Sequence, residues 1–582
     1  MPRRWYWIFF IAILLFATVI RLWHLGQLPV SLYWDEAAMY VDVKSVIETG
    51  KDMHGRPWYQ LIYPSYGDYK LPAYIWSATA SSKVFGLSEF SLRFPSAVAG
   101  ILTVLVAGLL TRTLLQQATR TKYTAKFLDN AQLLTMLVVS TAPWSVQFSR
   151  TAFEGHLGQL LLATSILFAV IGLRKTQRWL FWLSPIIGAV ATYSYFSVRF
   201  VWIAVYLLVC AVVIWQQCLD GRLQAHRFQS QLRKIWRVGL KVLLGLALFG
   251  LLLLPLLRSP LAKDTDRFRL GTASVLNNDG LVHQSNLYRA LAGNTPIDRV
   301  IFNKYWLTLH ELLRNYSDNT SPNFLFVSGD PNLRHGTGQT GLFLLVLAPL
   351  FITGFAVLYK RHFWLATFLV GWWILALLPA SVPENTPHAL RSLNALVPLA
   401  ITIGFGTTWC WQRTRRTSLK FLLVGIWGLC FVWYWWFYTT IYPVTSADDW
   451  QSGYKPLAQE LTAALSQGKT AYLIPFDDRF YLWIMAYGEH RGQDFQRWQS
   501  DDYKFATTKS DQNFERVFFS APDDVELLKA VQEGKQPLLI GKREAITERC
   551  SQSQTFTCTV EEVYDEVMKP KFAIATLTPK SL

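Results

Sequence analysis

Long apolar segments alternate with short polar stretches over roughly the first 440 residues of the chain. Each apolar segment has about the 20 residues that a helix needs to cross the hydrocarbon core of a bilayer. The predicted spans are residues 5–24, 94–115, 129–148, 156–173, 179–196, 198–216, 236–257, 340–358, 363–381, 389–410 and 419–438. The pattern therefore predicts a polytopic α-helical membrane protein with about eleven transmembrane helices.

One further segment, residues 71–86, is short for a span and contains Lys83. If it lies on the membrane without crossing, and the N-terminus with Arg3 and Arg4 is cytoplasmic, the basic loop residues fall on the cytoplasmic side, as the positive-inside bias requires. These residues are Arg112, Arg120, Lys122, Lys126, Arg174, Lys175, Arg178, Arg222, Arg227, Arg233, Lys234, Arg237, Lys241, Lys360, Arg361, Arg413, Arg415, Arg416 and Lys420. We therefore expect an interfacial or re-entrant helix over 71–86 and an uncleaved first span.

This topology assigns the longer polar segments to the outer side of the plasma membrane. They are residues 27–92 (the first outer loop), 149–156, 258–339 (the large outer loop), 381–388 and everything after about residue 442. We expect a membrane module over residues 1–442 and a separate extracytoplasmic domain over 443–582. Long outward loops of this kind commonly carry function.

The predicted outer domain mixes helical and strand patterns. Residues 455–467 and 523–532 have helical spacing, and short apolar runs are typical of strands. These runs are residues 471–475, 481–487, 516–519, 537–540 and 572–577. The sequence thus predicts a small α/β domain. Its outer location permits a disulfide between Cys550 and Cys558 without proving one, and the six cysteines of the chain lack metal-ligand spacing such as CxxC.

Composition supports the membrane assignment and limits the function classes. The chain has 582 residues, of which 52% are hydrophobic and 16% charged, against about 25% charged in soluble domains. The net charge of +17 follows from the basic cytoplasmic loops, and no basic cluster lies on a soluble domain suited to nucleic acid. The sequence contains neither GxxxxGK[ST] nor GxGxxG, so nucleotide-driven chemistry has no support.

Two adjacent acids, Asp35 and Glu36, directly follow the first span. Ionisable residues at a membrane boundary are costly to desolvate and so indicate a functional site, although a solvated acid beside an aromatic membrane anchor is an alternative. Neighbouring residues of a helix point about 100° apart. We therefore expect only one of the two to face a substrate atom while the other supports it.

Arginines accompany the acids on the outer side. Arg93, in L-R-F-P-S-A, opens the second span and either binds a phosphate as a fork or extends toward lipid headgroups. Arg150 and Glu154 are four residues apart, so they either pair with each other or contact a substrate. Arg391 and Asn394 enter an apolar span, where polar groups usually face a cavity.

A lipid-linked phosphate would account for this combination of groups. Arginines would hold the phosphate, and a carboxylate would take the proton of an attacking hydroxyl. The residues predicted to bind the donor phosphate are Arg93, Arg150 and Arg391, and those predicted to line the substrate cavity are Lys70, Glu154, Arg334, His335, His388 and Asn394. No metal ligands are assigned, and a divalent cation is left open.

Five motifs, in this order, resemble the lipid-carrier-dependent GT-C glycosyltransferases. They are the Asp-Glu pair after the first span, G-D-Y-K-L-P, R-F-P-S-A, S-R-x-A-F-E and H-A-L-R-S-L-N, and the resemblance covers roughly residues 1–440. The nearest pattern is that of family 39, the dolichyl-phosphate-mannose protein mannosyltransferases and their bacterial relatives. The resemblance implies that Asp35 is the catalytic base and that Arg93 holds the carrier phosphate.

By the same resemblance, the reaction is an inverting transfer of a monosaccharide from a polyprenyl-phosphate carrier to a hydroxyl of a protein, lipid or glycan. The C-terminal domain does not match the lumenal insert of the mannosyltransferases, so the acceptor stays open. A pyrophosphate-carrier oligosaccharyltransferase or glycan ligase is one alternative. It usually needs a divalent cation, for which Asp35, Glu36, Asp42, Glu154 and Asp330 could supply carboxylates.

The other alternative is a transporter of a lipid or an anion. Transporters commonly show repeated halves and broken helices near the bilayer midplane. The polar groups of this chain are instead predicted at one face of the membrane, which favours chemistry at the surface.

Overall fold

The computed structural model describes residues 3–65, 68–117, 123–173, 177–221, 228–263, 275, 279–474, 478–489, 491–492 and 516–580. Some sequence predictions lie outside these residues, namely those on Gly67, Arg120, Lys122, Arg174, Lys175, Arg222, Arg227 and Pro475. The chain separates into two compact units. The first comprises residues 1–23 and 95–438, and the second comprises residues 24–94 and 439–582.

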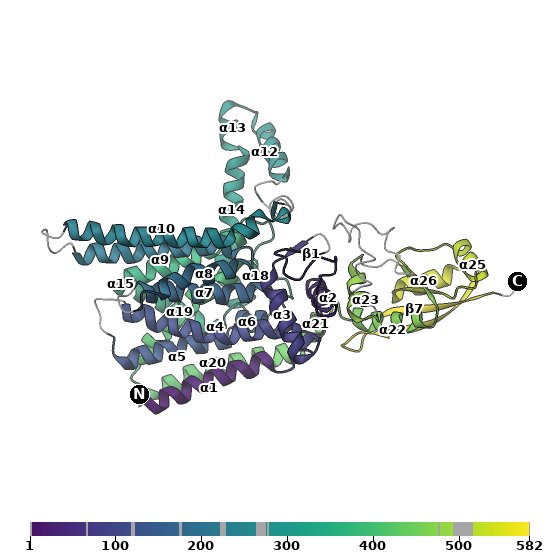
Figure 1. The fold of residues 1–582 in the computed structure, drawn as a ribbon, viewed down its shortest axis with the longest axis horizontal. Coiled ribbons are helices and arrows are strands. Elements are labelled where there is room, and N and C mark those ends of the chain that lie inside the picture. Colours follow the sequence, from purple (N-terminus) through teal and green to yellow (C-terminus); the bar gives the residue numbers. More distant parts are fainter. Residues whose placement is uncertain are drawn as a thin grey trace. The chain divides into compact units, whose positions relative to one another are not determined.

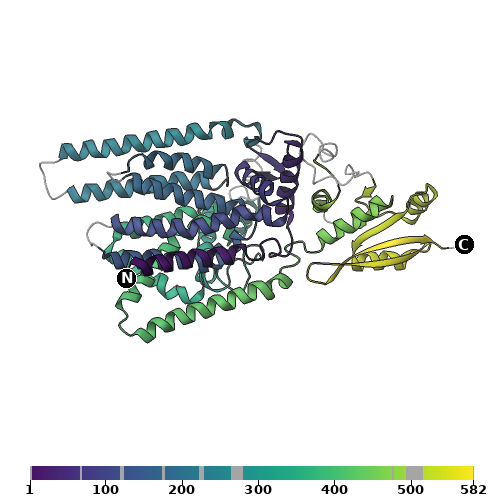
Figure 2. The ribbon, with the colours of Figure 1, turned by 60° about the horizontal axis from the view of Figure 1, so that its bottom comes forward.

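The first unit is a bundle of long apolar helices (Figures 1 and 2). Its helices at the predicted spans are α1 (Arg3–Leu22), α4 (Glu89–Gln117), α5 (Ala125–Thr141), α7 (Glu154–Gly172), α8 (Leu180–Thr192), α9 (Val198–Gly221), α10 (Phe228–Arg258), α15 (Ala348–Arg361), α16 (Phe363–Ala376), α19 (Leu396–Arg413) and α20 (Thr417–Thr440). Within the described residues, eight helical stretches are long and apolar enough to cross a membrane, and α8 is a shorter apolar helix. The chain is thus a multi-pass helical membrane protein.

Two predicted spans differ from the helices observed. Residues 129–148 do not form one helix, because α5 ends at Thr141 and α6 (Pro143–Ser149) begins with a proline. Proline lacks the N–H that would continue the preceding helix, but it fits a first turn. The span predicted at 340–358 begins only at Ala348, after the 3-10 turn η4 (Leu345–Leu347).

Shorter helices and turns connect some of the long helices between residues 279 and 395. They are α12 (Asp279–Ala292), α13 (Pro296–Ile301), α14 (Lys304–Thr320), the π-helical turn η3 (Asn323–Val327), α17 (Leu378–Ser381), α18 (Ala389–Ser392) and η5 (Leu393–Ala395). The loop after η3 is held against it by backbone hydrogen bonds from Leu342 to Phe324 and from Phe343 to Leu325. This loop contains the predicted residues Arg334 and His335.

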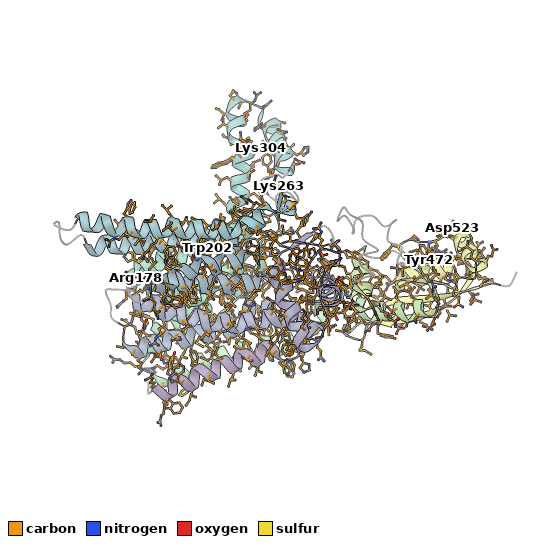
Figure 3. All side chains as sticks on the ribbon, in the orientation of Figure 1. Arg178, Trp202, Lys263, Lys304, Tyr472 and Asp523 are labelled. Carbon is orange, nitrogen blue, oxygen red and sulfur yellow. A yellow bond between two sulfur atoms is a disulfide. The ribbon has the colours of Figure 1, made fainter. Side chains whose placement is uncertain are left out.

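Aromatic stacking holds part of the bundle together. Trp202, labelled in Figure 3, is fully buried and stacks on Tyr206 and Phe249, with ring centroids 4.6 and 4.1 Å away. Its indole N–H donates a 2.6 Å hydrogen bond to the Ser165 hydroxyl. Since a buried Trp needs a partner for its N–H, this bond ties α9 to α7 and the stacking ties α9 to α10.

The second unit contains the first outer loop together with the C-terminal segment. The loop forms α2 (Trp34–Thr49), an antiparallel hairpin of β1 (Tyr63–Ser65) and β2 (Asp68–Lys70), and α3 (Pro72–Phe85). The predicted helix at 71–86 is confirmed as α3, which is not among the helices long enough to span. The prediction assigned this loop to the membrane module, but α2 packs against the C-terminal helix α23 (Tyr481–Tyr487).

The C-terminal segment folds around a five-stranded sheet with the order β4-β3-β5-β7-β6. Its elements are α21 (Tyr442–Thr445), α22 (Tyr454–Ser466), β3 (Thr470–Ile474), η6 (Asp478–Phe480), α23, β4 (Val517–Phe518), α25 (Asp524–Gln532), β5 (Pro537–Lys542), α26 (Arg543–Gln552), β6 (Phe556–Tyr564) and β7 (Pro570–Pro579). Strands β4, β3 and β5 are parallel, β7 pairs antiparallel with β5, and β6 pairs antiparallel with β7. Leu527, Ile546 and Leu539 belong to the core between α25, α26 and the sheet, and Tyr472 of β3 is labelled in Figure 3.

The sequence predicted most of these elements but not all. Residues 481–487 are the helix α23 and not a strand, because periodicity cannot distinguish a short, fully buried helix from a buried strand. Helix α26 and strand β6 were not predicted. Cys550 of α26 and Cys558 of β6 form a disulfide, which the sequence only permitted.

Candidate functional site

Asp35 and Glu36 lie in the first turn of α2, where carboxylates interact favourably with the positive end of the helix dipole. The backbone N–H of Trp34, at the start of this helix, donates a 3.2 Å hydrogen bond to the side-chain oxygen of Gln451. A residue of the C-terminal segment therefore helps to fix the helix end that carries both acids.

Glu36 is fully buried and is bound by Arg93, which is also fully buried. The Arg93 guanidinium forks onto the Glu36 carboxylate through Nε (3.1 Å) and Nη2 (2.8 Å). Its other N–H groups donate to the backbone carbonyls of Leu25 (3.3 Å), Pro29 (2.8 Å) and Ser31 (2.7 Å). Arginine has five N–H donors, and these contacts use all five.

This arrangement differs from the phosphate contact predicted for Arg93. A guanidinium whose donors are all bound to the protein has none left for a phosphate, and a fully buried one is not at the surface. In this structure Arg93 positions Glu36 and the preceding loop. The prediction that Asp35 and Glu36 point in different directions agrees with the structure, because the Asp35 side chain is 20% exposed while that of Glu36 is not exposed.

Asp35 forms an ion pair with Lys70, which ends strand β2. The Lys70 side chain is only 7% exposed, so the ammonium is largely removed from water and its attraction to the carboxylate is strengthened. The pair combines a partly accessible carboxylate with a buried ammonium that has three N–H donors. Such a pair can accept a proton and bind an anion.

A second acid lies deeper in the same unit. Asp42 is fully buried, and one carboxylate oxygen accepts a 3.2 Å hydrogen bond from the Met53 N–H. Burial and the nearby Asp52 charge raise the pKa of Asp42 well above its ordinary value. Asp52 is also fully buried, but it accepts more hydrogen bonds than Asp42, from the N–H groups of His54 (2.9 Å) and Arg56 (2.7 Å) and from the Gln60 side chain.

An arginine and a tryptophan from the C-terminal segment lie beside the start of α2. The Arg479 guanidinium lies 4.4 Å from the centre of the Trp34 ring, and Trp450 packs edge-on against Tyr33 at 5.5 Å. The Trp450 ring also lies 5.9 Å from the Arg93 guanidinium. Sequence reasoning missed Gln451, Trp450 and Arg479, since no local pattern links them to residues 33–36.

In the first unit, Arg150 is buried at the end of α6 and holds the end of α1. It donates to the carbonyls of Ile20 and Trp23, each at 2.7 Å, and lies over the rings of Trp435 and Tyr438. The predicted helical pairing of Arg150 with Glu154 assumed one continuous helix, but α6 ends before Arg150 and α7 begins at Glu154. The structure therefore places Arg150 as a contact between helices, whereas its predicted role was to bind a phosphate.

Asp330, His335 and His388 lie together in the first unit. The His335 Nδ1 is 2.9 Å from an Asp330 carboxylate oxygen, and the rings of His335 and His388 are 4.6 Å apart. Burial, followed by the neighbouring His335 and Arg391, lowers the pKa of His388 well below its ordinary value. One atom from each of the three residues could bind a common metal ion.

Three of the remaining predicted residues lie near this cluster in the sequence, namely Arg334, Arg391 and Asn394. The Arg334 N–H and Nε both donate to the Asn332 side chain (3.0 and 3.2 Å). Arg391 lies in α18 and is half-buried, and Asn394 is buried and donates to the Ser197 hydroxyl at 3.3 Å. The site roles predicted for Glu154, Arg334, Arg391 and Asn394 stay predictions.

The structure thus gathers the predicted residues into two groups, one in each unit. Asp35, Glu36, Lys70 and Arg93 meet in the second unit, and Asp330, His335 and His388 meet in the first. Together with the bundle and the α/β segment, these features define a polytopic membrane protein with an additional folded segment after the last span.

Comparison with solved structures identifies the fold more closely. ArnT from Cupriavidus metallidurans in the apo state matches with a TM-score of 0.50 at 13% identity, covering 98% of this chain and 97% of ArnT. ArnT bound to undecaprenyl phosphate matches with a TM-score of 0.51, also at 13% identity, covering 99% and 98%. The chain therefore shares its fold with ArnT over nearly its full length.

The remaining comparisons do not identify the fold or the family any further. The oligosaccharyltransferase AglB from Archaeoglobus fulgidus, in complex with an inhibitory peptide and a dolichol-phosphate, matches with a TM-score of 0.45 at 15% identity, covering 93% of this chain and 70% of AglB. A likeness of that size does not establish a common fold. No protein-family model matches the sequence, and no curated protein matches it significantly, so the predicted assignment to family 39 is not confirmed.

Proposed function

We propose that this protein is a membrane glycosyltransferase that moves a monosaccharide from a polyprenyl-phosphate carrier to an acceptor hydroxyl. The observation that carries the proposal is the ion pair between the partly exposed Asp35 and the buried Lys70, beside a Glu36 that is held by Arg93. The fold shared with ArnT, which has been crystallised with undecaprenyl phosphate, supports a carrier of the same class.

The proposed reaction needs a base and an anion-binding group. The acceptor oxygen forms a bond to the anomeric carbon, the bond from that carbon to the carrier phosphate oxygen breaks, and the phosphate leaves with the electron pair. Asp35 takes the acceptor proton, which lowers the barrier because positive charge develops on the attacking oxygen. Inversion at the anomeric carbon follows from one such displacement.

Lys70 replaces Arg93 as the proposed phosphate-binding residue. A lysine ammonium at the Asp35 carboxylate is suited to the negative charge that develops on the departing phosphate. Arg93 acts indirectly, because it fixes Glu36 and the loop that precedes α2. This division of roles accounts for two adjacent acids of which only one is accessible.

We place the reaction on the outer face of the plasma membrane, with the N-terminus cytoplasmic. The positive-inside distribution of Lys and Arg supports this orientation. The Cys550–Cys558 disulfide supports it independently, since such bonds persist in oxidising compartments outside the cytoplasm. The acceptor is a protein, a lipid or a glycan of the cell envelope.

The test is single-turnover transfer by purified protein in lipid, with a panel of polyprenyl-phosphate sugars. Asp35→Asn keeps the shape but removes the basicity, so transfer should slow by about 10²–10⁴-fold while donor still binds. Lys70→Met should instead weaken donor binding, and Lys70→Arg should restore part of it.

The matched control is Asp448→Asn, because the Asp448 side chain is 91% exposed and lies far along the chain from the proposed base. It should leave transfer unchanged. Transfer at the wild-type rate by Asp35→Asn would rule out Asp35 as the base. Failure of every polyprenyl-phosphate sugar to serve as donor for the wild-type protein would reject the proposed function itself.

A further inference from the structure

We propose that Asp330, His335 and His388 bind one divalent metal ion of the zinc class. Two imidazoles and one carboxylate are a common ligand set for such ions. This inference rests on the geometry of the first unit alone, and it does not depend on the proposed glycosyl transfer.

The three side chains are already close enough to share an ion. One potential ligand atom from each residue lies within 4.8 Å of the other two. Tetrahedral zinc, with bonds of about 2.0–2.1 Å, places its ligand atoms about 3.3 Å apart. The 2.9 Å separation between the Asp330 oxygen and the His335 nitrogen is close to this value, so small side-chain rotations would complete the site.

The backbone around the cluster holds the ligands in place. The Asp330 carboxylate accepts hydrogen bonds from the N–H groups of Asn332 (2.8 Å) and Ala389 (2.7 Å). Hydrogen bonds of this kind orient a ligating carboxylate. Gly329, with φ +75°, makes the turn before Asp330, and a Cβ there would lie 2.6 Å from the Thr340 carbonyl oxygen, so this turn requires glycine.

The surroundings are largely shielded from water. Asp330 and His335 are only 3% and 6% exposed, and the His335 ring packs against Phe148 and Phe153 at 5.8 and 5.7 Å. A cavity of about 10 Å³ borders Asp330 and His335, which is about the space that one water molecule needs. A water molecule in this cavity would lie beside two of the three proposed ligands.

The donor set indicates which ions should bind. Imidazole nitrogen suits zinc and the neighbouring transition metals, whereas Mg²⁺ and Ca²⁺ prefer sites made of oxygen atoms. We therefore expect Zn²⁺ and Co²⁺ to bind far more tightly than Mg²⁺. The ion would connect the outer loop that carries Asp330 and His335 to the start of the span that begins at Ala389.

The same contacts could exist without metal. An Asp330–His335 hydrogen bond with His388 packed beside it would also join the loop to the span. A metal-free contact of this kind would not bind zinc and would not be stabilised by it. A measurement of metal binding therefore distinguishes the metal site from the metal-free contact.

The experiment uses the full chain in detergent, with any affinity tag removed and metal first stripped by a chelator. The wild-type protein should take up one Zn²⁺ per chain, measured by elemental analysis after gel filtration. Co²⁺ should give the visible absorption of a tetrahedral nitrogen–oxygen site. Zn²⁺ should also raise the unfolding temperature, because a ligand that binds only the folded state stabilises it.

His335→Gln and Asp330→Asn should lower the Zn²⁺ affinity at least 10-fold and abolish the Co²⁺ absorption. His388→Gln is a third variant, at a half-buried side chain whose Nδ1 also accepts a 3.4 Å hydrogen bond from the Arg391 N–H of α18. His310→Gln removes an exposed histidine of the same outer segment and should change nothing. The proposal would be overturned if the wild-type protein bound Zn²⁺ no more tightly than a correctly folded His388→Gln variant. It would also be overturned if the wild-type protein bound Mg²⁺ as tightly as Zn²⁺.

Discussion

Replacement of Arg93 by lysine distinguishes the role that the sequence suggested from the role that the structure assigns. If Arg93 bound a phosphate, lysine would keep the positive charge and the folded protein would survive with weakened donor binding. In the structure, the five guanidinium donors bind the Glu36 carboxylate and the carbonyls of Leu25, Pro29 and Ser31. Arg93→Lys should therefore destabilise the protein directly.

The magnitude follows from counting donors. A lysine ammonium has three N–H donors where arginine has five, so at least two of the five buried acceptors lose their partner. Each buried unsatisfied group costs about 1–3 kcal/mol, which gives a loss of about 2–6 kcal/mol. Arg93→Met leaves the Glu36 charge uncompensated, and the loss of one partner of a buried ion pair alone costs about 3–5 kcal/mol. Either loss is a large part of the roughly 5–15 kcal/mol by which proteins are usually stable.

The first measurement is the unfolding temperature of the full chain in detergent, monitored by fluorescence-detected gel filtration after heating. The second is donor binding by the protein that stays folded. Arg314→Lys is the matched control, because the Arg314 side chain is 66% exposed and its ion pair with Glu311 lies on the surface. This substitution should change stability by less than about 0.5 kcal/mol. An Arg93→Lys protein that unfolds at the wild-type temperature but binds donor poorly would refute the structural role and restore the phosphate contact.

Two further substitutions should alter stability. The raised pKa of Asp42 means that the folded state keeps this proton above the pKa of the unfolded chain, so stability falls as the pH rises between the two values. Asp42→Asn should abolish this pH dependence and stabilise the folded state near pH 7 but not near pH 3. The gain in the free energy of unfolding should be about 1.4 kcal/mol per unit of pKa elevation and should appear as a higher unfolding temperature. An equal effect at both pH values would contradict the assignment. Cys558→Ser opens the loop closed by the disulfide, whose ends are 8 residues apart, and should destabilise the C-terminal sheet by about 2 kcal/mol. Limited proteolysis measures this loss, with the free Cys430 replaced by serine as the control.

Local pattern was sufficient for most of the helices. The apolar segments of about 20 residues predicted the spans because a bilayer imposes that length whatever the tertiary contacts. The same reasoning placed α3 outside the spans and, from the 100° rotation between helical neighbours, predicted that Asp35 and Glu36 face different surroundings. It went wrong at residues 129–148 and 481–487, where a proline and a short buried run made the pattern ambiguous.

The partners of the charged residues were beyond the reach of local pattern. Arg93 meets Glu36 across 57 residues, Lys70 meets Asp35 across 35, and the Asp330 carboxylate binds the Ala389 N–H across 59. The sequence could therefore name Arg93 and Lys70 as candidates, but it could not tell that the arginine supports an acid and the lysine meets the accessible one.

The sequence by itself determined most of the spans, the acids at the start of α2 and the α/β character of the C-terminal segment. Only the tertiary structure decided which carboxylate is accessible, which cation accompanies it, and that Asp330 lies close to two histidines. The physical reason is that helix formation and membrane insertion depend on residues a few positions apart. The partner of a buried charge depends instead on which distant segments pack together to remove it from water.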